Sequence, residues 1–226
     1  MAAMILTREK VYDPVLRIIH AWNALAIVLL LLGAQLAKWL EYTPEAIFLW
    51  RFHVWAGYAL VVGLAARVLW GVNGPAHARL SSLWHWRAWM AAVRARAWFT
   101  APSDWGHHPV ASLAYVLLYL MLVVMAISGL LLVAVEQGAG PLAPWFAHAV
   151  ELKWLFKTPH DWLERLILGF VVLHMAALLL HESRHGIPLA QAMVTGYQYR
   201  TVPHAAPTSG GEERRSGSER CESSND

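Results

Sequence analysis

Cysteine is almost absent from this chain, and charged residues are scarce. The single cysteine, Cys221, lies in a polar C-terminal segment, so the chain cannot form a disulfide framework or a cysteine metal site within itself. Charged residues make up 15% of the 226 residues, whereas a soluble domain has about 25%. The composition argues against a soluble protein, and any cofactor must be held by other side chains, of which the 12 histidines are the obvious candidates.

Long apolar blocks occupy most of the sequence, of which 58% is hydrophobic. Each block has about the 20 residues that cross a bilayer core of about 30 Å. Each must be helical, because the hydrocarbon offers no water to an unpaired backbone group. We therefore predict an all-α, integral membrane four-helix bundle within residues 1–200, with no strands. The predicted helices cover residues 16–39, 46–70, 110–135 and 160–182.

The positions of lysine and arginine predict the orientation. Basic residues gather before the first block, in the 71–109 connection and after the fourth block, and the other two connections carry fewer. By the positive-inside rule, both termini and the 71–109 connection face the cytoplasm. We expect a bacterial inner-membrane location, and we expect no nucleic-acid binding, since no such motif is present. The 71–109 connection also carries tryptophans that predict an interfacial helix: Trp84, Trp86, Trp89 and Trp98.

The two ends of the chain have separate interpretations. The first block could be a signal peptide, but it is long for one and no clear cleavage site follows it. The tail over residues 203–226 is rich in Ser, Gly, Glu and Arg. Such a segment cannot bury apolar area, so we expect it to be disordered.

Four histidines lie inside the predicted spans, where ionisable side chains are costly and usually functional. His160 and His174 are 14 positions apart on one helix, which places them within about 40° of one face and about 21 Å apart along the axis. His20 lies near the inner end of the first helix, and His53 lies near the outer end of the second. Depth therefore pairs His20 with His174 and His53 with His160.

Paired imidazoles at two depths suit two haem groups, because imidazole is a common axial ligand of haem iron. The alternative for any single histidine is an ordinary hydrogen-bonded core residue. His181 lies seven residues after His174 on nearly the same face, and it is an alternative inner ligand. A zinc site at His181 and His185 is less favoured, because only Glu182 is a suitable neighbour.

Four arginines near the histidines are candidate partners for the anionic haem propionates. For Arg17 and Arg51, the alternative is snorkelling to the lipid headgroups. Glu164 could neutralise Arg165 instead. Glycines near the histidines could let a flat macrocycle approach, or could serve ordinary helix packing. The arginines are Arg17, Arg51, Arg67 and Arg165, and the glycines are Gly33, Gly57, Gly63, Gly129 and Gly169.

Several motifs resemble the bacterial cytochrome b561 family and the related cytochrome b subunits of nickel-iron hydrogenases. The resemblance covers residues 11 to about 200. One departure is His108, where the family more often has asparagine. The motifs are Val11-Tyr12-Asp13-Pro14-Val15-Leu16-Arg17 leading into His20 and Trp22, His53 with Gly57-Tyr58, Arg67 to Trp70-Gly71, Gly106-His107-His108-Pro109, and Met193-Val194-Thr195-Gly196.

The resemblance implies two haems b, ligated by one histidine from each of the first two helices and two from the fourth. It also implies a quinone or quinol as one redox partner. The other partner would be a periplasmic redox protein, either a c-type cytochrome or a hydrogenase. A membrane-anchor subunit of a periplasmic dehydrogenase and a non-haem transporter are the rival functions. Whether the chain acts as a quinone oxidoreductase, and whether it forms a homodimer, are left open.

Overall fold

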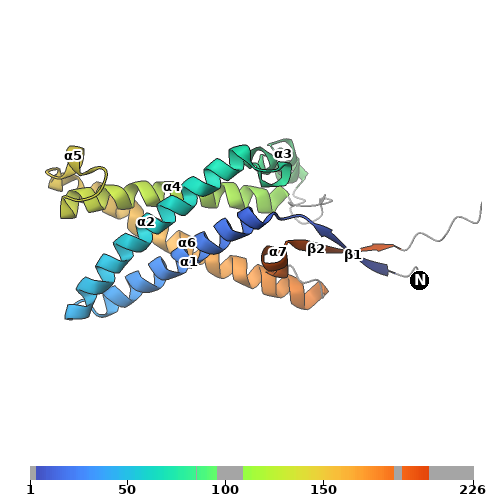
Figure 1. The fold of residues 1–226 in the computed structure, drawn as a ribbon, viewed down its shortest axis with the longest axis horizontal. Coiled ribbons are helices and arrows are strands. Elements are labelled where there is room, and N and C mark those ends of the chain that lie inside the picture. The colour runs from blue at the N-terminus through green and yellow to red at the C-terminus, as the bar shows by residue number, and fades with distance from the viewer. Residues whose placement is uncertain (1–3, 85, 96–108, 186–189, 204–226) are drawn as a thin grey trace, which may run out of the picture.

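Four long helices dominate the computed structural model, which describes residues 4–84, 86–95, 109–185 and 190–203 (Figure 1). Each contains a stretch long and apolar enough to cross a membrane. This arrangement confirms the predicted all-α membrane bundle. The helices are α1 (Pro14–Trp39), α2 (Pro44–Asn73), α4 (Pro109–Gln137) and α6 (Lys153–His185).

Local sequence signals set the ends of α1 and α2. The Asp13 side chain caps α1 by accepting a hydrogen bond from the Leu16 amide at 2.9 Å, and Pro14 supplies a fixed φ at the first helical position. Thr43 and Pro44 begin α2 in the same way, although the Thr43 side chain makes no capping bond. Gly74 ends α2, and its amide donates to the Trp70 carbonyl at 2.8 Å.

The fourth membrane helix begins earlier than the sequence predicted. It starts at Lys153 instead of residue 160, and Pro159 lies inside it. Proline lacks the amide that would bond to residue i−4, so it usually ends or kinks a helix. Here it lies close to the N-terminus of α6, where the missing bond affects little of the helix. The predicted outer connection is correspondingly shorter, and it contains α5 (Ala143–Phe146) and the 3₁₀ turn η3 (Val150–Leu152).

The bundle is built from two helix pairs. Helix α1 packs mainly on α2, α4 packs mainly on α6, and contacts between α2 and α4 join the pairs. A small apolar core lies where the pairs meet, and large apolar side chains face outward, as expected for a surface in contact with lipid. The core is Ala26, Leu60, Leu64, Leu122 and Ile167. The outward-facing residues include Leu25, Leu32, Val62, Leu166 and Leu173.

The connection between α2 and α4 carries the predicted interfacial helix, α3 (Trp86–Ala95), after the 3₁₀ turns η1 (Ala76–Ala78) and η2 (Leu80–Leu83). Trp84 and Trp86 are exposed, as an interfacial position requires. Trp89 is buried instead, and its indole Nε1 donates to Ser112 Oγ of α4 at 3.0 Å. This bond attaches α3 to the bundle. Trp98 lies outside the described residues.

A pair of strands, which was not expected from the sequence, extends beyond the start of α1 (Figure 1). Strand β1 (Met4–Lys10) pairs antiparallel with β2 (Tyr197–Pro203), with Met4 opposite Pro203 and Lys10 opposite Tyr197. The short helix α7 (Ala190–Thr195) lies beside the start of α1 (Figure 1). The expectation of no strands is therefore corrected. The predicted tail lies almost entirely outside the described residues, which end at Pro203.

Candidate functional site

Two of the predicted histidines face each other inside the bundle. His53 comes from α2 and His160 from α6, so they belong to different helix pairs. Their ring centroids are 6.4 Å apart and the ring planes are inclined by 70°. The rings border a cavity of about 550 Å³ that lies between all four long helices, a size within the usual range for small-molecule sites of about 300–1,000 Å³.

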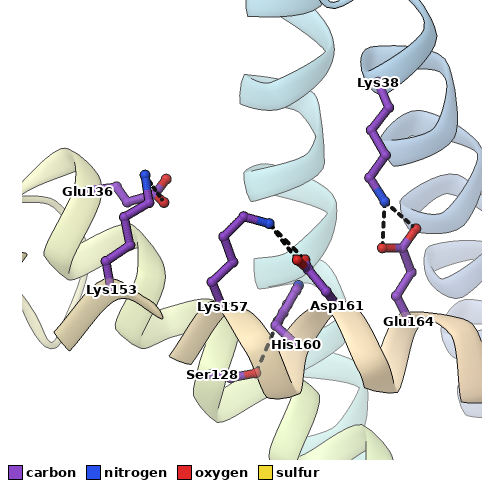
Figure 2. Close-up of polar contacts among 8 residues, drawn as sticks. All are labelled: Lys38, Ser128, Glu136, Lys153, Lys157, His160, Asp161 and Glu164. Atoms are coloured by element: carbon purple, nitrogen blue, oxygen red, sulfur yellow. Dashed lines mark hydrogen bonds and ion pairs between the residues drawn. The ribbon is translucent and has the colours of Figure 1, made fainter. Parts of the chain in front are cut away.

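The cavity is apolar around the histidines and charged toward the connection between α4 and α6. Three ion pairs connect its charged residues, as Figure 2 shows. The Lys153–Glu136, Lys157–Asp161 and Lys38–Glu164 pairs have N–O distances of 2.9, 2.6 and 2.7 Å. All six side chains line the cavity.

Glu164 is the most buried of these charged groups, with an exposed fraction of 9%. Its carboxylate accepts hydrogen bonds from Lys38 at 2.7 and 2.9 Å and from Gln35 at 2.5 Å, both on α1. These bonds join α1 to α6 across the weakest seam of the bundle. From the sequence, Glu164 was expected only to neutralise its neighbour Arg165. The missed signal was Lys38, an opposite charge at a matching depth in the first span.

His160 is held in place by α4. Its Nδ1 lies 3.0 Å from Ser128 Oγ, and Ser128 Oγ also lies 3.0 Å from the carbonyl oxygen of Met125. The next residue, Gly129, allows the ring to approach, because a Cβ there would lie 3.3 Å from His160 Cε1. Ser128 was not among the predicted site residues.

The predicted glycines fall into different classes. Gly57 and Gly129 line the cavity, and a Cβ on Gly57 would meet open space. Gly63 serves helix packing, since a Cβ there would lie 2.0 Å from Asn23 Oδ1 of α1. Gly33 lies at ordinary contact distance from Phe52, and Gly169 has open space beside it. Only part of the small-residue pattern therefore relates to the cavity.

The donor set of the cavity fits a haem better than a bare metal ion. Among the described residues, no group of three or more histidine, cysteine or acidic side chains could hold a metal ion, whereas zinc requires at least three protein ligands. Haem iron requires only two axial ligands. Two imidazoles that bind one metal atom at about 2.0–2.1 Å from each nitrogen have ring centroids about 6 Å apart, close to the 6.4 Å observed. In addition, His53 Nδ1 is buried without a hydrogen-bond partner among the described residues.

The other two predicted histidines lie further along the same bundle. His20 is near the N-terminus of α1, and His174 follows His160 by 14 residues on α6. The ring of His174 is stacked on Phe170, with centroids 6.0 Å apart and planes inclined by 8°. His181 is partly buried further along α6.

The four predicted arginines occupy different environments. Arg17 donates hydrogen bonds to the carbonyls of Met193, Val194 and Thr195 at the end of α7. Arg67 is buried and donates to Tyr119 Oη and to the Ala78 carbonyl, each at 3.1 Å. Arg51 and Arg165 are exposed and do not line the cavity. The guanidinium of Arg165 lies 5.1 Å from the ring centroid of Trp162.

Comparison with known families identifies the chain. The sequence profile of the family described as prokaryotic cytochrome b561 matches residues 11–196. This chain belongs to the prokaryotic cytochrome b561 family. Comparisons with curated proteins and with solved structures give no match.

Family membership fits the described fold and site. The chain is a multi-pass bacterial membrane cytochrome of b type, which binds haem b, contacts lipid and exchanges electrons with redox partners. The suspected resemblance is confirmed, and the rival interpretation as a non-haem transporter is set aside. Residues 11–196 include all four candidate ligands and the Ser128–His160 contact.

Proposed function

We propose that this cytochrome b561 holds two haems b and carries electrons across the bacterial inner membrane, between a periplasmic redox protein and the quinone pool. The observation that carries the proposal is the opposition of His53 and His160 across the cavity. When bound, haem supplies the one-electron chemistry, and the protein supplies ligation, orientation and a dry environment.

Each proposed haem site joins the two helix pairs. His53 and His160 form the outer site, and His20 and His174 form the inner site, so every site takes one ligand from the α1–α2 pair and one from α6. The two ligands on α6 are separated by about 21 Å of helix at 1.5 Å per residue. The outer site then lies near a periplasmic partner and the inner site near the cytoplasmic face, which is the arrangement that transmembrane electron transfer needs.

The charged end of the cavity carries three lysines, each already paired with a carboxylate. We propose that Lys38, Lys153 and Lys157, which line the cavity, would exchange these partners to bind a haem propionate there. Arg51 and Arg165 stay predictions for the same role, and their exposed side chains would have to turn inward. Arg17 and Arg67 stay predictions for the inner propionates, in addition to the protein hydrogen bonds that they already make.

The test is haem stoichiometry in the purified protein, measured from its reduced-minus-oxidised spectrum and by extraction of the pigment. Two haems per chain are expected. His53→Ala and His160→Ala should each remove the same haem, and His20→Ala and His174→Ala should each remove the other. His148→Ala is the matched control, because His148 is an exposed histidine of the outer connection. One haem per chain, or two haems in all four variants, would overturn the proposal.

Two further measurements address the open alternatives. If His181→Ala removes the inner haem and His174→Ala does not, His181 replaces His174 as the ligand. Quinone-dependent reoxidation of the reduced protein in liposomes tests the proposed membrane partner. Reoxidation at the same rate with and without added quinone would contradict that partner.

A further inference from the structure

The contact between Ser128 and His160 links the tautomer of the histidine ring to the direction of the serine hydroxyl. A serine hydroxyl carries one hydrogen, and a carbonyl oxygen can only accept. When the serine hydrogen is directed at the Met125 carbonyl, 3.0 Å away, Ser128 Oγ is left to accept in its second contact, with His160 Nδ1–H as the donor. In that arrangement the lone pair of the neutral ring is on Nε2.

We propose that Ser128 is a positioning residue for the outer haem ligand, which fixes His160 in the tautomer and ring orientation that present Nε2 to iron. This inference rests on the proposed function, because it assumes that His160 is a ligand. A histidine that binds a metal usually donates its second ring N–H to an acceptor, which orients the ring and makes the ligating nitrogen more basic. Ser128 is such an acceptor, and its own hydrogen is held by the α4 backbone.

The surroundings strengthen the effect of this bond. Ser128 is 5% exposed and lies within a membrane-spanning helix, so water does not compete for the hydroxyl. Gly129 leaves room for the ring edge on the same turn of α4. Figure 2 shows Ser128 meeting the His160 ring from α4.

The two proposed ligands of the outer haem, His53 and His160, differ in the hydrogen bonding of Nδ1. His53 Nδ1 is buried without a hydrogen-bond partner among the described residues, whereas His160 Nδ1 is bonded to Ser128. The Ser128 contact therefore acts on one of the two axial ligands of the outer haem, and the inner haem offers an internal reference within the same molecule.

Ser128→Ala tests the proposal by redox titration and haem retention. Loss of the acceptor makes His160 a weaker electron donor, so ferric haem is stabilised less and the outer midpoint potential should rise. A tenfold change in the relative affinity for ferric and ferrous haem corresponds to about 59 mV for one electron. Loss of an outer-shell partner typically weakens metal binding about 10- to 100-fold, so faster loss of one haem is also expected. The inner potential should stay unchanged.

Ser128→Thr keeps a hydroxyl and should restore the wild-type potential. Ser112→Ala is the matched control, since Ser112 is a buried serine of the same helix whose hydroxyl accepts from Trp89. If Ser128→Ala is too unstable to purify, Ser128→Cys replaces the hydroxyl with a much weaker hydrogen-bonding group and should show the same upward shift. Unchanged potentials in Ser128→Ala or Ser128→Cys, or equal shifts in Ser112→Ala, would overturn the assignment.

The same experiments separate this inference from the proposed function. If His160→Ala lacks one haem while Ser128→Ala keeps both haems at wild-type potentials, the ligand assignment stands and the role of Ser128 is wrong. If His160→Ala retains both haems, the proposed outer site itself is wrong.

Discussion

Replacement of Arg17 separates two roles for this side chain. The structure shows it bonded through three nitrogens to the last carbonyls of α7, whereas the sequence pattern predicted a propionate partner. In the first role, Arg17→Gln loosens α7 from the start of α1, while the Gly196 carbonyl still accepts from the Val11 and Tyr12 amides. In the second role, it changes the potential of the inner haem.

The size of the first effect follows from the hydrogen bonds. Three bonds at about 0.5–1.5 kcal/mol each give about 2–3 kcal/mol when their partial exposure is considered. At about 1.4 kcal/mol per tenfold change, local opening becomes about 30- to 150-fold more frequent. Hydrogen exchange of the amides in α7 should accelerate by up to that factor, because exchange in such a segment reports local opening.

The assay is hydrogen–deuterium exchange by mass spectrometry, with a redox titration of the same samples. Arg17→Lys should accelerate exchange partially, because a lysine provides one compact donor group in place of a planar fork. Arg51→Gln is the control, since Arg51 is exposed on α2. Unchanged exchange over residues 190–203 together with a shifted inner potential would refute the structural role and favour the propionate role.

Three further predictions follow from the packing and the polar contacts. Gly63→Ala places a Cβ 2.0 Å from Asn23 Oδ1, so we expect it to lower the free energy of unfolding by about 1–3 kcal/mol. The melting temperature should fall, and an unchanged melting temperature would contradict this prediction. Lys38→Met leaves the buried Glu164 with Gln35 as its remaining partner and should lower the melting temperature more than Lys38→Arg. Burial raises the pKa of Tyr12 from 10.0 to about 12, so the folded state binds the phenolic proton more tightly than the unfolded state. Stability is then full below pH 10 and falls between about pH 10 and 12. In Tyr12→Phe this part of the alkaline loss should disappear, and an identical pH profile would refute it.

Much of the architecture could be predicted because the bilayer imposes it. The length of an apolar block and the exclusion of unpaired backbone give four helices directly. The fixed rise of a helix then places His160 and His174 at different depths. In the structure His53 lies opposite His160, and the pairing of the four histidines as haem ligands stays a prediction.

Other features depend on contacts between distant residues, which no local pattern encodes. The early start of α6 was missed because proline usually breaks a helix, and Pro159 lies just before the predicted start. The roles of Ser128 and Lys38 depend on which residues α4 and α1 bring to α6, and a serine or a terminal lysine is unremarkable in a membrane helix. The environments of Arg51 and Arg165 depend on helix rotation, which sequence position alone does not determine.

The pairing of β1 with β2 has a consequence for biosynthesis. Met4 lies opposite Pro203, so a segment that leaves the ribosome among the first must wait for one made after the last membrane crossing. During that interval β1 presents unsatisfied strand edges, which favour pairing with other chains. Pairing of β1 with β2 would therefore be a late event. Chains released before it would be prone to aggregate and accessible to proteases that remove incomplete products.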